Sequence, residues 1–177
     1  MSAKRAAASS CAVWATAWGP MGAAAGDAGL VRVVLPHYSR GDLAELLAWE
    51  HAGAVEDEAP FAELIERSRA YFNGRRVDLE DLPCVLPPAR GLCGQVLRAC
   101  RAIPYGRTTS YGRLAKELSR PDAARAVATC LSKNPLPLVI PCHRVTYADG
   151  RPGGFSAPGG PEQKARMLAL ERGCAAR

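Results

Sequence analysis

The stretch from Leu136 to Val145 constrains this chain more than any other. It opens with the apolar run Leu136-Pro137-Leu138-Val139-Ile140, which is typical of a short buried strand. Pro141 should end that strand, because proline has no N–H to donate to a sheet. The chain then presents Cys142 and His143 side by side, followed by an arginine. A thiol becomes a strong nucleophile when a base or a positive environment makes it a thiolate, so this stretch predicts a nucleophile at the mouth of a buried element.

Taken alone, a Cys-His pair is more simply explained as a buried structural cysteine beside a surface histidine, because short motifs match by chance. The wider sequence favours a functional pair, since a series of motifs follows in order between Gln95 and Gly173. They are Ile103-Pro104-Tyr105-Gly106, Ser110-Tyr111-Gly112-Arg113-Leu114-Ala115, Ala123-Ala124-Arg125-Ala126-Val127, Asn134-Pro135-Leu136-Pro137 and Pro141-Cys142-His143-Arg144-Val145. In order and spacing the series closely resembles the O6-alkylguanine-DNA alkyltransferases, also called methylated-DNA–protein-cysteine methyltransferases.

The net charge of +6 is unevenly distributed. Residues 1–89 carry 8 Lys and Arg against 12 Asp and Glu, a balance of −4, whereas residues 90–177 carry 15 against 5, a balance of +10. A concentrated basic surface is the footprint of a polyanionic partner such as nucleic acid, although a solvated basic face would give the same count. Because the motifs lie in the basic half, DNA binding is expected there.

The cysteines and histidines indicate neither a metal site nor a disulfide framework. Seven cysteines occur at irregular spacing without a Cys-x-x-Cys pair, and the three histidines are scattered. We therefore expect reduced thiols, no metal, and a location in the cytoplasm or nucleoid, or in the nucleus of a eukaryote. No apolar run approaches the ~20 residues that span a bilayer, and the start of the chain does not resemble a signal peptide, so no membrane contact is expected.

The length of 177 residues allows one domain or two small ones. The segment Leu82-Pro83-Cys84-Val85-Leu86-Pro87-Pro88 is typical of a connector. We therefore expect an α/β supporting domain at residues 1–82, a Pro-rich linker at 83–90, and a DNA-binding and alkyl-acceptor domain at 91–177.

The first half predicts a small antiparallel sheet with helices. Its strand-like segments are residues 13–25, 30–35 and 77–79, with a turn signal at 26–29. One helix is expected after Ser39 or Asp42, which are candidate caps, and another from Pro60 to Asn73. Nothing in this half carries a catalytic pattern.

The second half predicts a mainly α, helix-turn-helix or winged-helix-like domain. Helices are expected at residues 96–102, from Ser110, at 123–132, with Asp122 as a candidate cap, and at 164–172. Two short helices joined by a four-residue turn form a helix-turn-helix pattern. The second of these helices opens with small residues on both sides of Arg125, so it could approach a groove closely.

The resemblance implies single-turnover DNA repair without a cofactor. The family flips a damaged guanine out of double-stranded DNA from the minor groove and moves the O6-alkyl group to a cysteine that matches Cys142; O4-alkylthymine is a further candidate substrate. Extrusion is needed because the O6 atom lies inside the base stack. The thioether product has no electrophilic carbonyl, so each protein molecule should be consumed. A monomer is expected, with cooperative binding to DNA left open.

The resemblance also implies catalytic roles. Cys142 matches the acceptor, His143 the base that acts through a water, and Glu171 the carboxylate that orients this histidine. Asn134 matches an asparagine that ties the recognition helix to the cysteine turn, and Tyr111 a phenol that donates to the departing guanine. From the residues alone, Glu171 would be a solvated charge, Asn134 a helix C-terminal residue and Tyr111 a core aromatic. We also expect a depressed thiol pKa that depends on the histidine.

Pocket and DNA contacts follow from the same resemblance. The pocket residues are Ser156 near O6, Val145 with its carbonyl facing the amino group of the base, Pro137 against bulky alkyl groups, and Phe155. Arg125 matches the residue that fills the gap left by the flipped base. Further DNA contacts are expected from Ala124, Ala126, Ser110, Arg113, Lys116, Arg120 and Lys133, with solvated surface charge as the equal alternative for the four cations.

The loop after Phe155 departs from the family pattern. The family usually has Tyr at this position and Ser-Gly-Gly where Ser156-Ala157-Pro158 stands, so the range of accepted alkyl groups is open. Two alternative functions are also compatible with the sequence. A non-enzymatic helix-turn-helix protein that binds DNA or lesions would not need Cys142, and a cysteine hydrolase built on the same cysteine, histidine and glutamate would turn over repeatedly.

Overall fold

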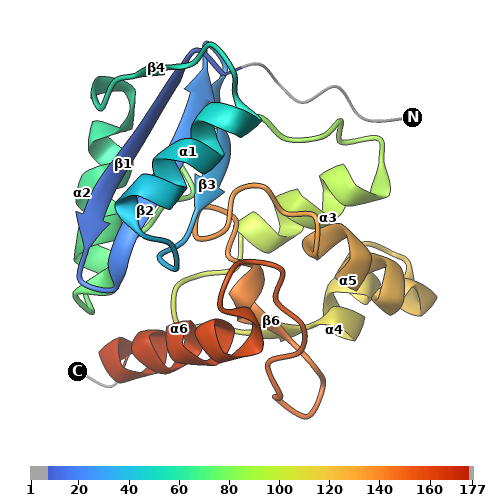
Figure 1. The fold of residues 1–177 in the computed structure, drawn as a ribbon. Coiled ribbons are helices and arrows are strands. Elements are labelled where there is room, and N and C mark those ends of the chain that lie inside the picture. The colour runs from blue at the N-terminus through green and yellow to red at the C-terminus, as the bar shows by residue number, and fades with distance from the viewer. Residues whose placement is uncertain (1–7, 176–177) are drawn as a thin grey trace.

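The N-terminal part of the computed structural model, which describes residues 8–175, is a four-stranded sheet with a helix on each face (Figure 1). Its elements are β1 (Ser10–Thr16), β2 (Gly19–Gly26), β3 (Gly29–Val34), α1 (Arg40–Glu50), β4 (Val55–Glu56), the 3-10 turn η1 (Ala59–Phe61) and α2 (Ala62–Phe72). The strand order is β3-β2-β1-β4. The first three strands pair antiparallel, and the short β4 adds parallel to β1.

The alternation of side chains along β1 decides which helix covers which face of the sheet. Val13 belongs to a buried cluster with Leu43 and Leu47 of α1. Its neighbours Ala12 and Trp14 point the other way, into the cluster that contains the buried face of α2. The two helices therefore lie on opposite faces of the sheet (Figure 1).

The predicted small sheet with helices is confirmed, but several details were wrong. Residues 13–25 form two strands rather than one segment, because the chain turns where Thr16 Oγ1 accepts from Trp18 N at 3.2 Å and donates to Gly19 O at 2.7 Å. β4 makes the sheet mixed, and residues 77–79 form no strand. The segment weighed as a signal peptide falls largely in residues 1–7, outside the described residues.

Each N-terminal helix has one boundary where the sequence predicted it, the start of α1 and the end of α2. Ser39 caps α1, with its Oγ accepting from the backbone N–H of Asp42 at 3.2 Å, and α2 stops at Asn73-Gly74. The buried residues of α2 are Leu64, Ile65, Ser68, Tyr71 and Phe72. This face carries a tyrosine into the interior at the C-terminal end of the helix.

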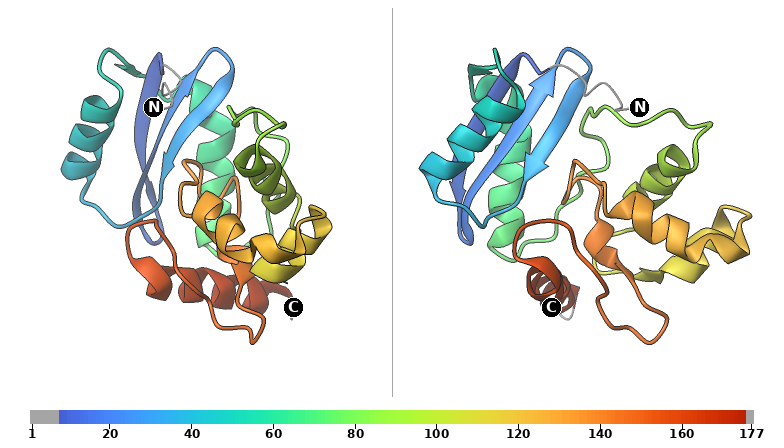
Figure 2. Two further views of the ribbon diagram at one scale, coloured as in Figure 1. Left: turned by 90° about the vertical axis from the view of Figure 1, so that its right-hand side faces the viewer. Right: turned by 45° about the vertical axis from the view of Figure 1, so that its right-hand side comes forward.

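The C-terminal part is mainly helical, as predicted. Its elements are α3 (Leu92–Arg101), β5 (Thr109–Ser110), α4 (Tyr111–Glu117), η2 (Pro121–Ala123), α5 (Ala124–Leu131), η3 (Cys142–Arg144), β6 (Val145–Thr146) and α6 (Gly160–Ala175). Helices α4 and α5, with η2 between them, form the helix-turn-helix, and β5 pairs parallel with β6. In Figures 1 and 2, α6 lies in the lower part of the view, beneath the N-terminal sheet. Arg166 of α6 stacks on the Trp18 ring at 3.7 Å, which ties this helix to the turn between β1 and β2.

Three predictions for this part were wrong. Asp122 caps no helix; it lies within η2, and α5 has no side-chain cap. Residues 136–140 form a buried loop with one isolated bridge rather than a strand, and Leu138 has a φ of 78°. The apolar character of residues 136–140 therefore reflects burial and not strand pairing. Helix α6 starts at Gly160 and does not stop at Gly173.

The Pro-rich connector lies against β3. Leu30 N donates to Pro83 O and Val85 N to Leu30 O, both at 2.9 Å. One cluster of buried apolar residues extends across both parts of the chain, from Trp14 and Phe61 to Val127 and Met167. The division at 83–90 stays a prediction, but the two parts share a core. No helix in the described part of the chain is long and apolar enough to cross a membrane.

The expectation that all cysteines are reduced was wrong for one pair. Cys93 of α3 and Cys130 of α5 form a disulfide with their Cα atoms 5.0 Å apart. The two are 37 residues apart in sequence and meet only because α3 packs on α5, so spacing could not reveal them. The bond ties the second helix of the helix-turn-helix to α3.

Candidate active site

Cys142 begins the turn η3 at the end of a buried loop. The loop residues Leu136, Leu138, Val139 and Ile140 are at most 1% exposed, and Cys142 itself is 5% exposed. Its backbone N–H donates to Ile140 O at 2.8 Å. The thiol is therefore held on a packed base rather than on a mobile segment.

Asn134 joins this loop to the end of α5. Its Nδ2 donates to Ile140 O at 2.9 Å and to Cys142 Sγ at 3.2 Å, while its Oδ1 accepts from Leu136 N at 3.0 Å. The amide thus fixes the loop at both ends. It also supplies a donor that favours a thiolate on Cys142.

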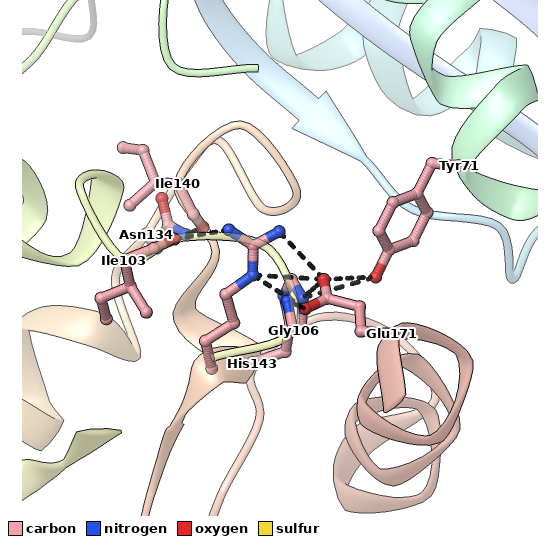
Figure 3. A network of polar contacts seen from close by, with 8 residues as sticks. Tyr71, Ile103, Gly106, Asn134, Ile140, His143 and Glu171 are labelled. Carbon is pink, nitrogen blue, oxygen red and sulfur yellow. Dashed lines mark hydrogen bonds and ion pairs between the residues drawn. The ribbon is translucent and has the colours of Figure 1, made fainter. Parts of the chain in front are cut away.

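His143 and Glu171 form the centre of a buried polar network (Figure 3). His143 Nε2 lies 2.7 Å from Glu171 Oε1, and the two residues are 0% and 1% exposed. An ionised carboxylate can only accept, so the imidazole proton sits on Nε2 and the lone pair on Nδ1. Nδ1 has no hydrogen-bond partner among the described residues. It is therefore available as a base.

Arg144 and Gly106 hold the other sides of Glu171. Arg144 donates from Nη2 to Oε1 and from Nε to Oε2, both at 3.0 Å, and from Nη1 to Ile103 O at 2.6 Å. Gly106 N donates to Oε2 at 2.9 Å. Burial opposes ionisation of Glu171, but His143 and Arg144 outweigh it and lower its pKa to about 2. The carboxylate is charged at neutral pH.

Burial also controls the state of His143. It lowers the pKa of the imidazole below its ordinary value, and the neighbouring cations Arg144 and Lys164 act in the same direction, while Glu171 acts against them. The histidine is therefore neutral at pH 7.

The expectation of a depressed thiol pKa was wrong. Burial raises the pKa of Cys142, and this outweighs the hydrogen bond from Asn134 and the positive charge of Lys164. The resting residue is a thiol. A thiol needs a base to take its proton before it can act as a strong nucleophile, and Nδ1 of His143, unpartnered among the described residues, is a candidate for that role.

Tyr111 is paired with a lysine. Lys164, 1% exposed, donates from Nζ to Val145 O at 2.6 Å and to the Tyr111 hydroxyl oxygen at 3.2 Å. Because the phenolic oxygen accepts from Lys164, its own proton is free to point elsewhere. Burial raises the pKa of Tyr111 to about 12 and lowers that of Lys164 to about 8. Tyr111 is thus a stable donor, and the Val145 carbonyl already has one partner.

Cys142 lies where two hollows meet. The first, of about 430 Å³, is lined by Tyr111, Phe155 and Ser156. The second, of about 640 Å³, is lined by Pro137, by the loop after Ser156 and by β3. Both volumes are in the range of small-molecule sites. A planar base and the group attached to it could therefore meet the sulfur from two sides.

The residues expected at DNA lie on the helix-turn-helix and next to it. Arg125 is exposed in the first turn of α5, between the half-buried Ala124 and Ala126. Ser110 caps α4, with its Oγ accepting from Arg113 N at 3.1 Å. The side chains of Arg113, Lys116, Arg120 and Lys133 are exposed.

Sequence reasoning missed Tyr71, Arg144 and Lys164. A signal existed for two of them. Arg144 stands inside the cysteine motif, and Lys164 lies seven residues before Glu171, a spacing that puts both on one helix face. Tyr71 lies on the buried face of α2, but nothing in the sequence shows that this face meets the cysteine turn.

Comparison with known proteins agrees with this geometry. A family model described as "6-O-methylguanine DNA methyltransferase, DNA binding domain" matches residues 92–173. The methylated-DNA–protein-cysteine methyltransferase of Mycolicibacterium paratuberculosis is 40% identical over 122 residues, which are 68% of this chain and 70% of that protein. A DNA base-flipping protein of Thermus thermophilus is 45% identical over 98 residues, 54% of this chain and 63% of that protein. The crystal structure of Mycobacterium tuberculosis OGT in complex with DNA matches with a TM-score of 0.74 at 30% identity over 93% of both chains. With the cysteine motif and the fold in place, these likenesses show that the chain belongs to the methylated-DNA–protein-cysteine methyltransferase family.

Proposed function

We propose that this protein repairs DNA by direct damage reversal, transferring the alkyl group of O6-alkylguanine irreversibly to Cys142. The observation that carries the proposal is the buried thiol at the meeting point of two hollows, next to a neutral histidine that Glu171 holds through Nε2, which leaves Nδ1 free. The names of its relatives, methylated-DNA–protein-cysteine methyltransferases, support the same chemistry.

The reaction proceeds by substitution at the alkyl carbon. His143 Nδ1 takes the thiol proton, through a water, and the sulfur forms a bond to the carbon as its bond to O6 breaks. The electron pair of the broken bond goes to the purine, and the Tyr111 hydroxyl donates to the leaving base. The product is a thioether, which water does not hydrolyse, so the protein is used once.

The base reaches the thiol by leaving the duplex. We propose that α5 enters the minor groove, where Arg125 occupies the place of the flipped base. The small side chains of Ala124 and Ala126 on either side of it support a close approach. The protein acts as a monomer where the chromosome lies, in the cytoplasm or nucleoid, or in the nucleus of a eukaryote. O4-alkylthymine is a second substrate of the same chemistry.

The alternative of a lesion-binding protein without transfer predicts that the thiol is dispensable. A relative named DNA base-flipping protein makes this alternative worth testing. Incubation with duplex DNA containing one O6-methylguanine should add one methyl group to the peptide that carries Cys142, in a burst of one event per protein. Sustained turnover would instead support a hydrolase, and binding without methylation would support the lesion-binding alternative.

The pH dependence of transfer should follow His143. Because its pKa is lowered by burial, the neutral base persists on acidification, so the rate with free O6-benzylguanine should fall to half its plateau only below about pH 6.5, the ordinary pKa of a histidine. In His143→Ala the rate should be low at neutral pH and rise continuously to above pH 9, as hydroxide forms the thiolate. The exposed His37→Ala is the control and should match the parent. A parent rate that already halves at pH 7 would contradict the assignment.

A further inference from the structure

Tyr71 reaches the active site from the N-terminal part of the chain. Its side chain is 0% exposed, and its hydroxyl oxygen lies 3.0 Å from Glu171 Oε1 and 3.4 Å from His143 Nε2 (Figure 3). Its ring packs edge-on against the rings of Phe72, Tyr105 and His143. These contacts on several sides fix where the hydroxyl points.

The three polar atoms form a closed triangle. His143 Nε2 and Glu171 Oε1 are 2.7 Å apart, and the Tyr71 hydroxyl oxygen is the third atom of the triangle. Since a carboxylate oxygen can only accept, the Tyr71 hydroxyl donates to Oε1. Its proton then points at Glu171, and the oxygen turns its lone pairs toward Nε2. Both features favour a proton on Nε2 and disfavour the tautomer that carries it on Nδ1.

We propose that Tyr71 is a positioning residue for alkyl transfer, whose hydroxyl holds Glu171 and keeps His143 in the tautomer with Nδ1 free to accept the thiol proton. The inference rests on the proposed function and adds a role for the N-terminal part of the chain. The N-terminal part carries no catalytic pattern of its own, but its Tyr71 hydroxyl belongs to the hydrogen-bond network that holds His143.

The hydroxyl also tunes the histidine. Each donor to Glu171 draws negative charge away from the side that faces His143, so removing one donor strengthens the carboxylate's hold on the imidazolium. The 3.0 Å bond to Glu171 outweighs the longer contact to the ring. The charged groups that act on His143 besides Glu171 are Arg144 of η3 and Lys164 of α6, and Cys142 precedes it in the chain. None of them changes in a Tyr71→Phe variant. Burial raises the pKa of Tyr71 well above its usual value, so it remains a donor.

Tyr71→Phe is the direct test, because it keeps the ring and removes only the hydroxyl. We expect the pKa of His143 to rise by about half a unit to one unit. In the pH profile of the transfer rate from O6-benzylguanine, the fall on the acid side should then shift to higher pH by the same amount. The rate at pH values on the acid side should fall about three- to tenfold, with little change at pH 8. Nitrogen NMR of labelled histidine side chains gives the pKa and tautomer without any transfer reaction. A failure of the proposed function therefore stays distinguishable from a failure of this inference.

Ser68→Ala is the matched control. Ser68 is another buried hydroxyl of α2, close to one turn earlier; it accepts from Trp14 Nε1 at 2.9 Å and donates to Ile65 O at 3.1 Å. Its loss should destabilise α2 without moving the histidine pKa. Equal shifts in both variants, or no shift in Tyr71→Phe, would reduce Tyr71 to a packing residue. An Nδ1–H tautomer in the parent protein would overturn the inference without any variant.

Discussion

Replacing Cys142 with serine is expected to abolish alkyl transfer and leave DNA binding unchanged. Serine has almost the same shape, and its oxygen can accept the hydrogen bond that Asn134 Nδ2 gives to the sulfur. A hydroxyl is far less acidic than a thiol, however, and the neutral His143 cannot convert it to an alkoxide. The loss should be roughly a thousandfold or more, as for other catalytic nucleophiles. Transfer of a labelled methyl group from duplex DNA to the protein measures it, and fluorescence anisotropy measures the binding.

Cys11→Ser is the control, because Cys11 is also a free cysteine but lies on β1, in the supporting sheet. It should transfer at the parental rate. Methyl label found on Cys11, Cys84 or Cys100 of the parent protein would contradict the role of Cys142. So would transfer by Cys142→Ser at close to the parental rate. Full lesion binding by this variant, together with the absence of transfer, would separate recognition from chemistry.

Much of the fold could be predicted because local signals were strong. Ser39, Ser110 and the Asn73-Gly74 stop each act within one helical turn, and each lies where it was expected. The errors have a different cause. The run at 136–140 is as apolar as a strand because it is buried, and its backbone is held largely by Asn134 rather than by a neighbouring strand. Periodicity reports burial and cannot show which partner supplies the hydrogen bonds.

The site was predictable as far as the motifs extend along the chain. The resemblance brought His143 and Glu171 to attention, and the structure places them 2.7 Å apart. The resemblance could not predict that the resting Cys142 is a protonated thiol. Its pKa is raised by burial, which is a property of the assembled core. Nor could the resemblance supply Tyr71, whose contact with Glu171 spans 100 positions in sequence. Contacts between distant segments are set by packing, which no local pattern records.

Replacing Arg125 with alanine is expected to slow repair of duplex DNA about 10- to 100-fold and to leave reaction with free O6-benzylguanine unchanged. Flipping a base costs a few kcal/mol, and a side chain that fills the gap offsets part of this cost. A contribution of about 1.4–2.8 kcal/mol corresponds to that range of rates. The free base needs no flipping, so its reaction should not depend on this residue. Arg125 is exposed on α5, and alanine is a better helix former, so the fold should be preserved.

Loss of positive charge alone could also weaken action on DNA, and Arg113→Ala separates the two effects. Arg113 is an exposed cation on α4, the other helix of the helix-turn-helix. If it contacts phosphate, its replacement should lower affinity and reduce the salt dependence of binding by about one unit of slope. A high DNA concentration should then restore the full transfer rate. Saturation should not rescue Arg125→Ala, because its defect lies in extrusion after binding. Full rescue of Arg125→Ala by saturating DNA would mean that Arg125 acts only through its charge in binding. An equal loss of rate on the free base would mean that its role is structural.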